Sequence, residues 1–481
     1  MSIQVYNVLS RQKEAFTPLN PELVTMYVCG PTVYDVPHIG HAKTYVSFDV
    51  IVRYLRFRGY RVRYVQNITD VGHILDTGED RILKGARRER IEPMEVVERY
   101  TRAYFDAMDA LGVTRPDISP RASAHIPEQI EMIKQLIADG YAYEVDGSVY
   151  FSVEKFPGYG KLSGRHVEEL EEGARIAVRD EKRHPADFAL WKKAEPEHIL
   201  RWPSPWSWGY PGWHIECSAM STKYLGETFD IHGGGVDNIF PHNECEIAQA
   251  EAATGKPFAR YWLLTGSLTL NGVKMSKSLG NVLNVAEALK KYSAQTIRYF
   301  ILSSHYSNPI DFSDAAVEAA AKGLERVLTP VRAVRDRLRA APASDDGADF
   351  AAVLAAHRAA LIEALDEDFN APAALGILNQ LTTDVNTLLN SGQSIGRSTL
   401  EAIDQLYRDF GGQVLGIIPD TFTPESNFEL VDGLVRLLIE LRKEARAAKD
   451  FKRSDQIRDQ LAALGVMLED GRGGTIYRLT K

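Results

Sequence analysis

Two short motifs far apart in the chain carry the residue types that bind a nucleoside triphosphate. His38, Gly40 and His41 follow a strand-like apolar run and precede an amphipathic helix expected over residues 42–57. A turn and a helix N-terminus at this place offer backbone N–H groups to anionic phosphates, and a glycine lets a ligand approach the backbone closely. We therefore predict that this junction binds the phosphates of ATP.

The second motif is the loop Lys274-Met275-Ser276-Lys277-Ser278. Its two ammonium groups, three positions apart, suit the negative charge that grows on a triphosphate as its α-phosphorus is attacked. Either motif alone is typical of an ordinary surface loop. Because both stand at strand-to-helix junctions of one α/β pattern, we interpret them as two halves of one site for Mg²⁺-ATP, with Lys274 and Lys277 stabilising the developing charge.

The elements that position the first motif form a β-α-β unit. Apolar residues 26–28, the helix 42–57 and the β-branched and aromatic residues 62–65 alternate as strand, helix and strand. A right-handed crossover of this kind builds a parallel sheet, whose ligand lies at the carboxyl ends of its strands. The segment that starts at Cys29 and the segment 67–70 fall at those ends. The pattern predicts an α/β fold with a Rossmann-type, parallel-sheet nucleotide-binding domain.

A mixed set of potential metal ligands lies beside this unit. It comprises two thiolates, one imidazole and one carboxylate: Cys29, Cys217, His242 and Glu246. His242 and Glu246 are four positions apart on a predicted helix, so their side chains share one face, and the whole set suits Zn²⁺. Isolated cysteines are more often core residues, however. Cys245 also leaves a second set open, a closed structural site in which it replaces Glu246.

The composition is that of an ordinary globular protein with two to four domains, since the 481 residues are 44% hydrophobic and 25% charged. Three cysteines cannot form a disulfide framework. A polar N-terminus without a signal-peptide core and the lack of a membrane-length apolar run favour the cytoplasm and no membrane partner. The net charge of −9 argues against indiscriminate binding of nucleic acid but leaves a local basic face possible.

Composition and periodicity divide the chain into segments. After an insertion the sheet pattern resumes; a helical bundle and a small α+β region follow, separated by linker-like stretches at 341–347 and 419–427. The helix expected over 436–448 carries arginines and lysines among acidic residues, for which a solvated face is the default. The predicted segments are 1–140 (first half of the catalytic domain), 141–211 (insertion), 212–270 (second half), 271–340 (lysine loop and helical junction), 350–418 (bundle) and 428–481 (C-terminal region).

The residues around these motifs resemble the class I aminoacyl-tRNA synthetases, and among them the cysteinyl-tRNA synthetase family. The resemblance runs from the N-terminus to the last strand. It is carried, in order, by YVCGPTVYD (27–35), NITD (67–70), PGWHIECSAM (211–220), HGGGVD (232–237) and PHNECE (241–246).

This resemblance implies that the protein activates L-cysteine with ATP and transfers it to the 3′ end of tRNA(Cys). It implies one Zn²⁺ that selects the substrate thiol, with Glu246 rather than Cys245 as the fourth ligand. The bundle and the C-terminal region would then bind tRNA, the latter near the anticodon. Separately from the resemblance, we expect a monomer.

The resemblance also assigns residues that carry little signal on their own. Thr69, Trp213 and Asp237 would bind the amino acid, although a lone tryptophan is more often core and the other two are typical of turn capping. Gly234, in a glycine triplet that usually marks a flexible turn, would bind ATP. With it the implied ATP-binding residues are His38, Gly40, His41, Gly234 and Lys277.

Two other functions fit parts of the pattern. A cysteine ligase of mycothiol biosynthesis shares the adenylating core but resembles a truncated relative, whereas residues 350–481 are present here. An inactive zinc-containing RNA-binding relative is the second, and the intact His38, Lys277 and metal set speak against it. The departures from the family are Gly72-His73 and Leu264, the latter in the pocket lining where many relatives have His.

Overall fold

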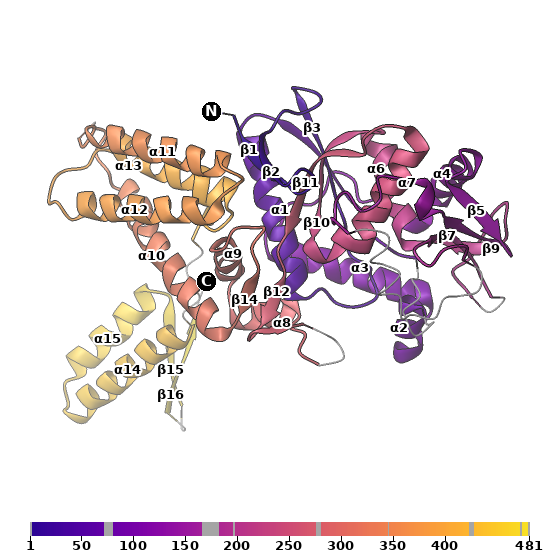
Figure 1. The fold of residues 1–481 in the computed structure, drawn as a ribbon. Coiled ribbons are helices and arrows are strands. Elements are labelled where there is room, and N and C mark those ends of the chain that lie inside the picture. Colours follow the sequence, from indigo (N-terminus) through magenta and orange to yellow (C-terminus); the bar gives the residue numbers. More distant parts are fainter. Residues whose placement is uncertain are drawn as a thin grey trace. The chain divides into compact units, whose positions relative to one another are not determined.

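The computed structural model describes residues 2–71, 80–165, 182–195, 198–275, 280–344, 346–422, 428–471 and 474–479. These residues fall into two compact units, Met1–Asp420 and Thr421–Lys481. Figure 1 labels most of their helices and strands. The departure Gly72-His73 and most of the second linker lie outside the described residues.

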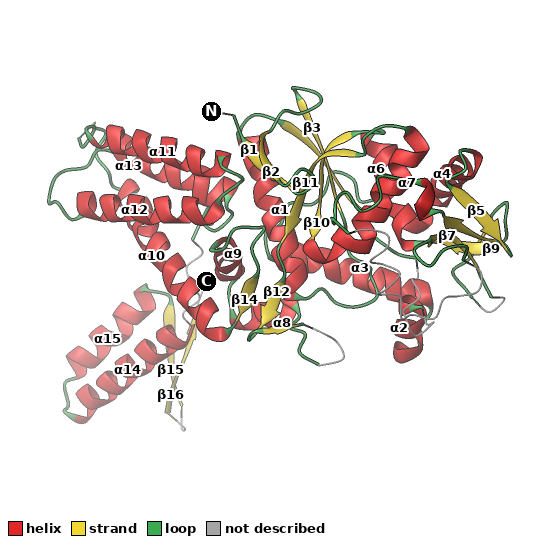
Figure 2. Ribbon diagram, in the orientation of Figure 1, coloured by secondary structure: helices red, strands yellow, loops and turns green. Residues whose placement is uncertain are grey.

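A parallel sheet forms the centre of the first unit. Among the described residues it has four strands (Figure 2), in the order β11 (Ala259–Thr265), β10 (Phe229–Gly235), β3 (Leu23–Val28) and β4 (Arg61–Gln66). The chain leaves β3 towards β4 on one side, while β10 and β11 extend the sheet on the other. Such a change of direction opens a crevice at the carboxyl ends of the central strands. The predicted α/β fold with a parallel sheet is confirmed.

Two helices cover the opposite faces of this sheet. A Cβ on Gly233 would lie 2.4 Å from the ring of Phe48, so the glycine lets α1 (Ile39–Phe57) close on β10. Tyr27 of β3 shares a buried cluster with Cys217 and Met220 of α6 (Trp213–Leu225). Since side chains alternate along a strand, the second helix covers the other face. This packing brings Cys217 over the end of β3.

The segment between β4 and α6 is partly helical and partly a second sheet. Among the described residues this sheet is antiparallel and has five strands, in the order β5-β6-β7-β9-β8. Phe151, Leu190 and Trp191 fill its core together with residues of α4 and α7. The elements are α2 (Arg81–Glu89), α3 (Pro93–Ala110), α4 (Ile126–Ala138), β5 (Ala142–Val145), β6 (Ser148–Phe151), β7 (Phe188–Lys193), β8 (Trp202–Pro203), β9 (Trp208–Pro211) and, after β10, α7 (Glu244–Thr254).

Helices and two small sheets complete the first unit. Buried Arg298 donates to the backbone of Leu415 and lies 2.7 Å from the carboxylate of Asp49, which ties the helices to α1. The remaining elements are β1 (Gln4–Asn7), β2 (Gln12–Ala15), β12 (Leu268–Leu270), β13 (Val273–Lys274), α8 (Val285–Lys291), α9 (Ala294–Leu302), β14 (Ile310–Phe312), α10 (Asp314–Leu338), α11 (Phe350–Asp366), α12 (Ala371–Leu389) and α13 (Arg397–Tyr407).

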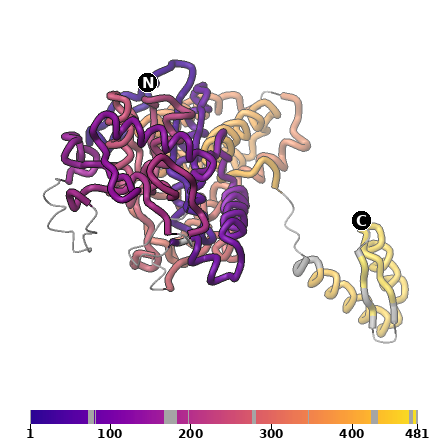
Figure 3. The backbone as a smooth tube through the Cα atoms, turned by 90° about the vertical axis from the view of Figure 1, so that its right-hand side faces the viewer, coloured from indigo at the N-terminus to yellow at the C-terminus, as the bar shows by residue number. Residues whose placement is uncertain are grey.

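The second unit is a helical hairpin followed by a β-hairpin (Figure 3). Val435, Leu461 and Val466 form its buried core. Its elements are α14 (Phe428–Ala447), α15 (Phe451–Ala463), β15 (Val466–Gly471) and β16 (Gly474–Leu479). In the described part of the chain, none of the helices combines the length and apolar character that crossing a membrane requires.

Candidate metal centre and nucleotide site

A cavity of about 680 Å³ lies at the carboxyl ends of the central strands. This volume is in the range that holds a nucleotide-sized ligand. Segments from β3, α1, β10 and the loop after β11 meet there. The predicted site residues that line it are Cys29, His38, Gly40, His41, Thr69, Trp213, Cys217, Asp237, His242 and Lys274.

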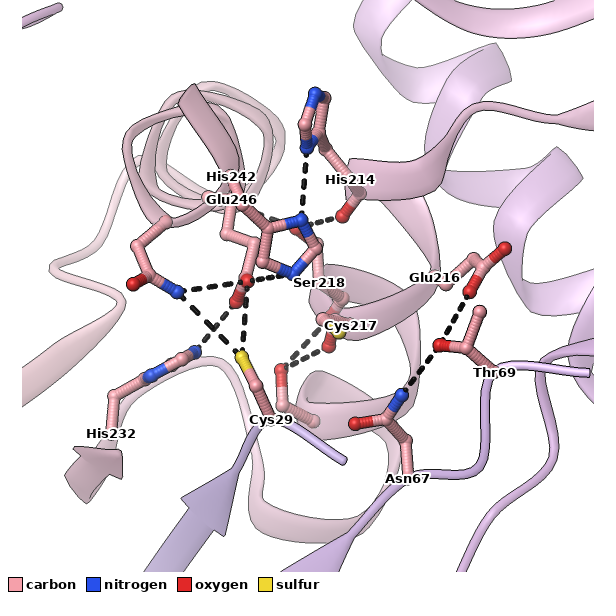
Figure 4. Close-up of polar contacts among 12 residues, drawn as sticks. Cys29, Asn67, Thr69, His214, Glu216, Cys217, Ser218, His232, His242 and Glu246 are labelled. Carbon is pink, nitrogen blue, oxygen red and sulfur yellow. Dashed lines mark hydrogen bonds and ion pairs between the residues drawn. The ribbon is translucent and has the colours of Figure 1, made fainter. Parts of the chain in front are cut away.

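The four predicted metal ligands come together at this cavity, which Cys29, Cys217 and His242 line and Glu246 does not. One donor atom from each of Cys29, Cys217, His242 and Glu246 lies within 4.8 Å of the other three, and all four residues are buried. Figure 4 shows the two thiols approaching from β3 and α6, opposite the imidazole and the carboxylate. His242 lies in a kinked π-helical segment, Ile239–Asn243, that precedes α7, yet its Nε2 still lies 2.8 Å from Oε1 of Glu246. The cluster is compatible with a metal site.

The outer atoms of two of these side chains are held by histidines that sequence reasoning did not single out. Nδ1 of His242 lies 3.0 Å from Nδ1 of His214, and Oε2 of Glu246 lies 2.6 Å from Nε2 of His232. Such contacts fix the tautomer and the orientation of a metal ligand. Both histidines stand inside the quoted motifs, but no spacing in the sequence indicates which ligand each one contacts.

The charges in the cluster fit a divalent cation. Burial would raise the pKa of Glu246, but His232 and His242 hold it well below its usual range. A hydrogen bond with Cys217 and burial raise the pKa of Cys29, whereas the same hydrogen bond lowers the pKa of Cys217. Burial opposes protonation of His242, yet Glu246 and Cys217 raise its pKa to about 10. A cation replaces protons in such a donor set, because metal ligands bind in their deprotonated forms.

Cys245 points away from the cluster. Its Sγ lies 3.4 Å from the hydroxyl of Tyr159, and it belongs to the core shared by α7 and the antiparallel sheet. Burial raises the pKa of its thiol. The geometry therefore favours the set with Glu246 over the alternative with Cys245, and the ligand roles themselves stay a prediction.

The first nucleotide motif differs from expectation at the helix start. Helix α1 begins at Ile39 rather than near residue 42, with His38 as its N-cap. Ile39 N–H donates to the Leu283 carbonyl at 2.9 Å, and Gly40 N–H donates to Nδ1 of His38 at 3.2 Å. His38 N–H in turn donates to Nδ1 of His41 at 3.1 Å. These three backbone N–H groups thus have partners inside the fold in this structure, and their role in phosphate binding stays a prediction.

The second nucleotide motif is partly described. Nζ of Lys274 lies 2.8 Å from Oδ1 of Asp237, and both side chains are exposed. The ion pair joins the lysine loop to the end of β10, a link that the sequence did not predict. Lys277 lies outside the described residues, so its role stays a prediction.

The remaining predicted residues lie as follows. The buried Thr69 hydroxyl donates to Glu216 at 3.2 Å and accepts from Asn67 at 3.0 Å. The ring of Trp213 is 37% exposed and lies 4.3 Å, centroid to centroid, from that of His242, next to the metal cluster. Gly234 is in strand β10 rather than in a flexible turn, and a Cβ there would meet no atom closer than 3.5 Å. The fold itself thus does not require a glycine at this position. Gly234 is not among the residues that line the cavity, and its assignment to ATP stays a prediction.

Lys43 is a buried cation that sequence reasoning missed. Its Nζ donates to the carbonyls of Gly266 at 2.6 Å, Asn308 at 2.8 Å and Tyr306 at 3.2 Å. Gly266 lines the cavity. The ammonium therefore fastens the loop after β11, which forms one wall of the nucleotide site, to the loop before β14.

Lys43→Met is expected to destabilise the protein, because it removes three hydrogen bonds made by a charged group, each of which contributes about 1.5–3 kcal/mol. Burial lowers the pKa of Lys43 from 10.5 to about 8. Between these values the unfolded chain binds a proton that the folded chain has lost, so the wild-type free energy of unfolding should rise there relative to that of the variant. Urea unfolding of both proteins at several pH values measures this, and parallel pH profiles would contradict the low pKa.

Comparison with known proteins fits this architecture. The family described as tRNA synthetases class I (C) catalytic domain matches residues 15–322, a DALR domain matches 360–419, and the cysteinyl-tRNA ligase anticodon binding domain matches 435–478. Among solved structures, Mycobacterium tuberculosis methionyl-tRNA synthetase in complex with methionyl-adenylate superposes with a TM-score of 0.59 at 17% identity, covering 85% of this chain and 93% of that one. At this identity the likeness concerns the fold alone.

Curated relatives match over nearly their whole length. The cysteine–tRNA ligase of Chlorobium luteolum is 50% identical over 490 residues, covering 100% of both chains. That of Deinococcus radiodurans is 50% identical, covering 99% of this chain and 97% of its own, and that of Thermus thermophilus is 49% identical, covering 100% of both.

The parallel sheet, its cavity and the matched catalytic domain define a class I aminoacyl-tRNA synthetase. Within that class the chain belongs to the cysteine–tRNA ligase family. The family resemblance seen in the sequence is confirmed.

Proposed function

We propose that the protein is an ATP-dependent cysteine–tRNA ligase, which activates L-cysteine to cysteinyl-adenylate and transfers it to the 3′ end of tRNA(Cys). One observation carries the proposal. The thiol-containing cluster opens into the same cavity that the two nucleotide motifs line. One molecule of cysteine could therefore place its thiol at the cluster and its carboxylate beside the triphosphate of ATP.

In the first step the cysteine carboxylate attacks the α-phosphorus of Mg²⁺-ATP in line, and pyrophosphate leaves. In the second, a terminal ribose hydroxyl of the tRNA attacks the acyl carbon, and AMP leaves. Both steps depend mainly on positioning and on stabilisation of charge. Lys274 and Lys277 would stabilise the charge on the phosphates. Because the cap formed by His38 and His41 uses backbone N–H groups at the start of α1, we assign phosphate contact to the imidazoles rather than to the helix backbone.

The substrate's amino acid part has its own proposed contacts. Trp213 would pack against it, since its ring is exposed beside His242. Thr69 and Asp237 would bind its charged groups. Because Asp237 already holds Lys274 at 2.8 Å, binding of the amino acid and the position of the lysine loop are coupled through this carboxylate.

We assign one Zn²⁺ to the cluster, held by Cys29, Cys217, His242 and Glu246. When bound, Zn²⁺ supplies a position that takes a thiolate far better than an alcohol. Loss of a dedicated polar contact of this kind discriminates between substrates by on the order of 10⁴-fold, whereas an apolar pocket separates similar side chains only weakly. The arrangement supports rejection of serine without a separate editing step.

The remaining assignments concern tRNA binding, oligomeric state and cellular compartment. We assign the helical bundle and the C-terminal unit to tRNA binding, the latter near the anticodon, because an anticodon binding domain matches residues 435–478. A monomer in the cytoplasm completes the proposal. The cytoplasm fits three cysteines that form no disulfide. The mycothiol-type ligase and the inactive relative are not favoured, since full-length cysteine–tRNA ligases match the whole chain.

The direct test is exchange of radioactive pyrophosphate into ATP. Exchange should require cysteine, and serine should not replace it. Absence of cysteine-dependent exchange in the folded, zinc-loaded protein would overturn the proposed function. Charging of an amino sugar instead of tRNA would favour the mycothiol-type ligase.

Removal of residues 429–481 is expected to spare cysteine-dependent exchange and to reduce charging of tRNA(Cys) by roughly 10²- to 10⁴-fold, as loss of one of two linked binding regions does. These residues fold as part of a separate compact unit, so the catalytic unit should survive their removal. The measurement is the rate of charging against tRNA concentration. Normal charging by the truncated protein would mean that the basic residues of α14 form an ordinary solvent-exposed face and do not bind tRNA.

A further inference from the structure

Asn243 is a buried amide that touches two of the four clustered side chains. It is the last residue of the turn Ile239–Asn243 before α7 and is 0% exposed. Its Nδ2 donates to Oε1 of Glu246 at 3.2 Å and to Sγ of Cys29 at 3.6 Å. One amide group therefore spans a carboxylate and a thiol that come from different elements.

Chemistry fixes the orientation of this amide. A carboxylate and a thiolate only accept hydrogen bonds, so the NH₂ end of Asn243 must face them. The consequence is that Oδ1 has no hydrogen-bond partner among the described residues. An unsatisfied buried oxygen costs about 1–3 kcal/mol. The fold thus accepts an unpaired carbonyl oxygen at Asn243, and both hydrogen bonds of its NH₂ group go to residues of the cluster.

The net negative charge of the ligand set explains why an uncharged hydrogen-bond donor fits at this place. Two thiolates and one carboxylate outweigh a divalent cation by one negative charge, and a substrate thiolate adds a second. A hydrogen bond to a ligand atom withdraws electron density from it and leaves the cation a stronger acceptor for a further ligand. A lysine or arginine at this place would repel the cation, whereas an amide donates without a charge.

We propose that Asn243 is a positioning residue that tunes the metal centre. By donating to Cys29 and Glu246 together, it fixes their relative position, which favours binding of the cation. It also weakens their electron donation, which leaves the bound cation able to accept the thiolate of the substrate. The proposal rests on the proposed function and deepens it. It separates the role of Asn243 from those of His214 and His232, which contact the outer atoms of one ligand each.

The test uses Co²⁺ as a coloured replacement for Zn²⁺ in the full-length protein without ATP or tRNA. Asn243→Leu removes both donors at similar volume. It is expected to weaken Co²⁺ affinity by about 10- to 100-fold, to move the thiolate-to-cobalt absorption to lower energy and to weaken the spectral response to added cysteine. The control is Gln249→Leu, also 0% exposed and on α7, whose amide contacts Ser218 rather than the cluster.

A second pair of variants guards against misfolding. Asn243→Ser and Asn243→Ala differ by one hydroxyl donor. The serine variant should bind Co²⁺ more tightly than the alanine variant, because the remaining donor still helps to position the ligands. Equal affinities within this pair, together with a wild-type affinity and absorption energy in Asn243→Leu, would overturn the inference alone. A wild-type protein that takes up no Co²⁺ or Zn²⁺ would overturn the metal assignment in the proposed function as well.

Discussion

Glu246→Ala is expected to release the metal ion or to abolish rejection of serine, whereas Cys245→Ser should leave both near normal. The carboxylate of Glu246 lies within the cluster and is held by His232 and His242, while Cys245 contacts Tyr159 in a separate core. Loss of a ligand should weaken metal binding by tenfold or much more. Discrimination between cysteine and serine should fall from on the order of 10⁴-fold towards the small ratio that an apolar pocket achieves.

The measurement is zinc content after dialysis together with pyrophosphate exchange supported by cysteine and by serine. Cys245→Ser is the matched control, since it changes the neighbouring residue, also 0% exposed. Zinc absorption-edge spectroscopy adds the number of sulfur neighbours. The centre should show two sulfurs alone and three with cysteine. Three sulfurs without substrate and no increase on adding it would mean a closed structural site, and the proposed thiol selection would be wrong.

Residue types and local spacing were enough to predict the parts of the site that depend on one element. His242 and Glu246 were placed together because four positions along a helical turn bring side chains to one face. Cys29 was placed beside the nucleotide motif because it follows a strand of a parallel sheet. Cys217 joins them through the packing of α6 over β3, which the family resemblance implied and the residue pattern did not.

Contacts between elements could not be predicted in the same way. His214, His232 and Asn243 act on side chains of other segments, and nothing in their spacing indicates these partners. The same holds for Lys43, which lies on the buried face of α1 and bonds to three distant carbonyls. A buried lysine within an amphipathic helix has no local signal that distinguishes it from an exposed one.

Two local expectations failed for physical reasons. The start of α1 was placed too late because histidine is not among the usual N-cap residues, yet the ring of His38 accepts from Gly40 and completes a cap with His41. A glycine triplet such as 233–235 usually marks a flexible turn, but here it forms the end of β10. Gly233 is needed there because Phe48 leaves no space for a Cβ. A local side-chain cap decided the first case, whereas packing against another element decided the second.

Lys277→Ala is expected to lower the rate of adenylate formation by roughly 10²- to 10³-fold, as removal of one preorganised donor from a transition state does. Binding of cysteine should change little, because the charge that Lys277 meets develops only on the phosphates. Lys274, three positions away, should not fully replace the lost charge of Lys277, because its ammonium group already pairs with Asp237 at 2.8 Å.

Single-turnover formation of adenylate measures the chemical step of Lys277→Ala, and cysteine binding is measured separately without ATP. Lys290→Ala, in the exposed last turn of α8, removes an equal charge outside the cavity and should change neither quantity. Lys274→Ala tests the link to Asp237, because the freed carboxylate should alter cysteine binding as well as the rate. If folded Lys277→Ala forms adenylate at the wild-type rate, the second nucleotide motif has no part in the reaction, and the developing charge must be met by Lys274 and the imidazoles alone.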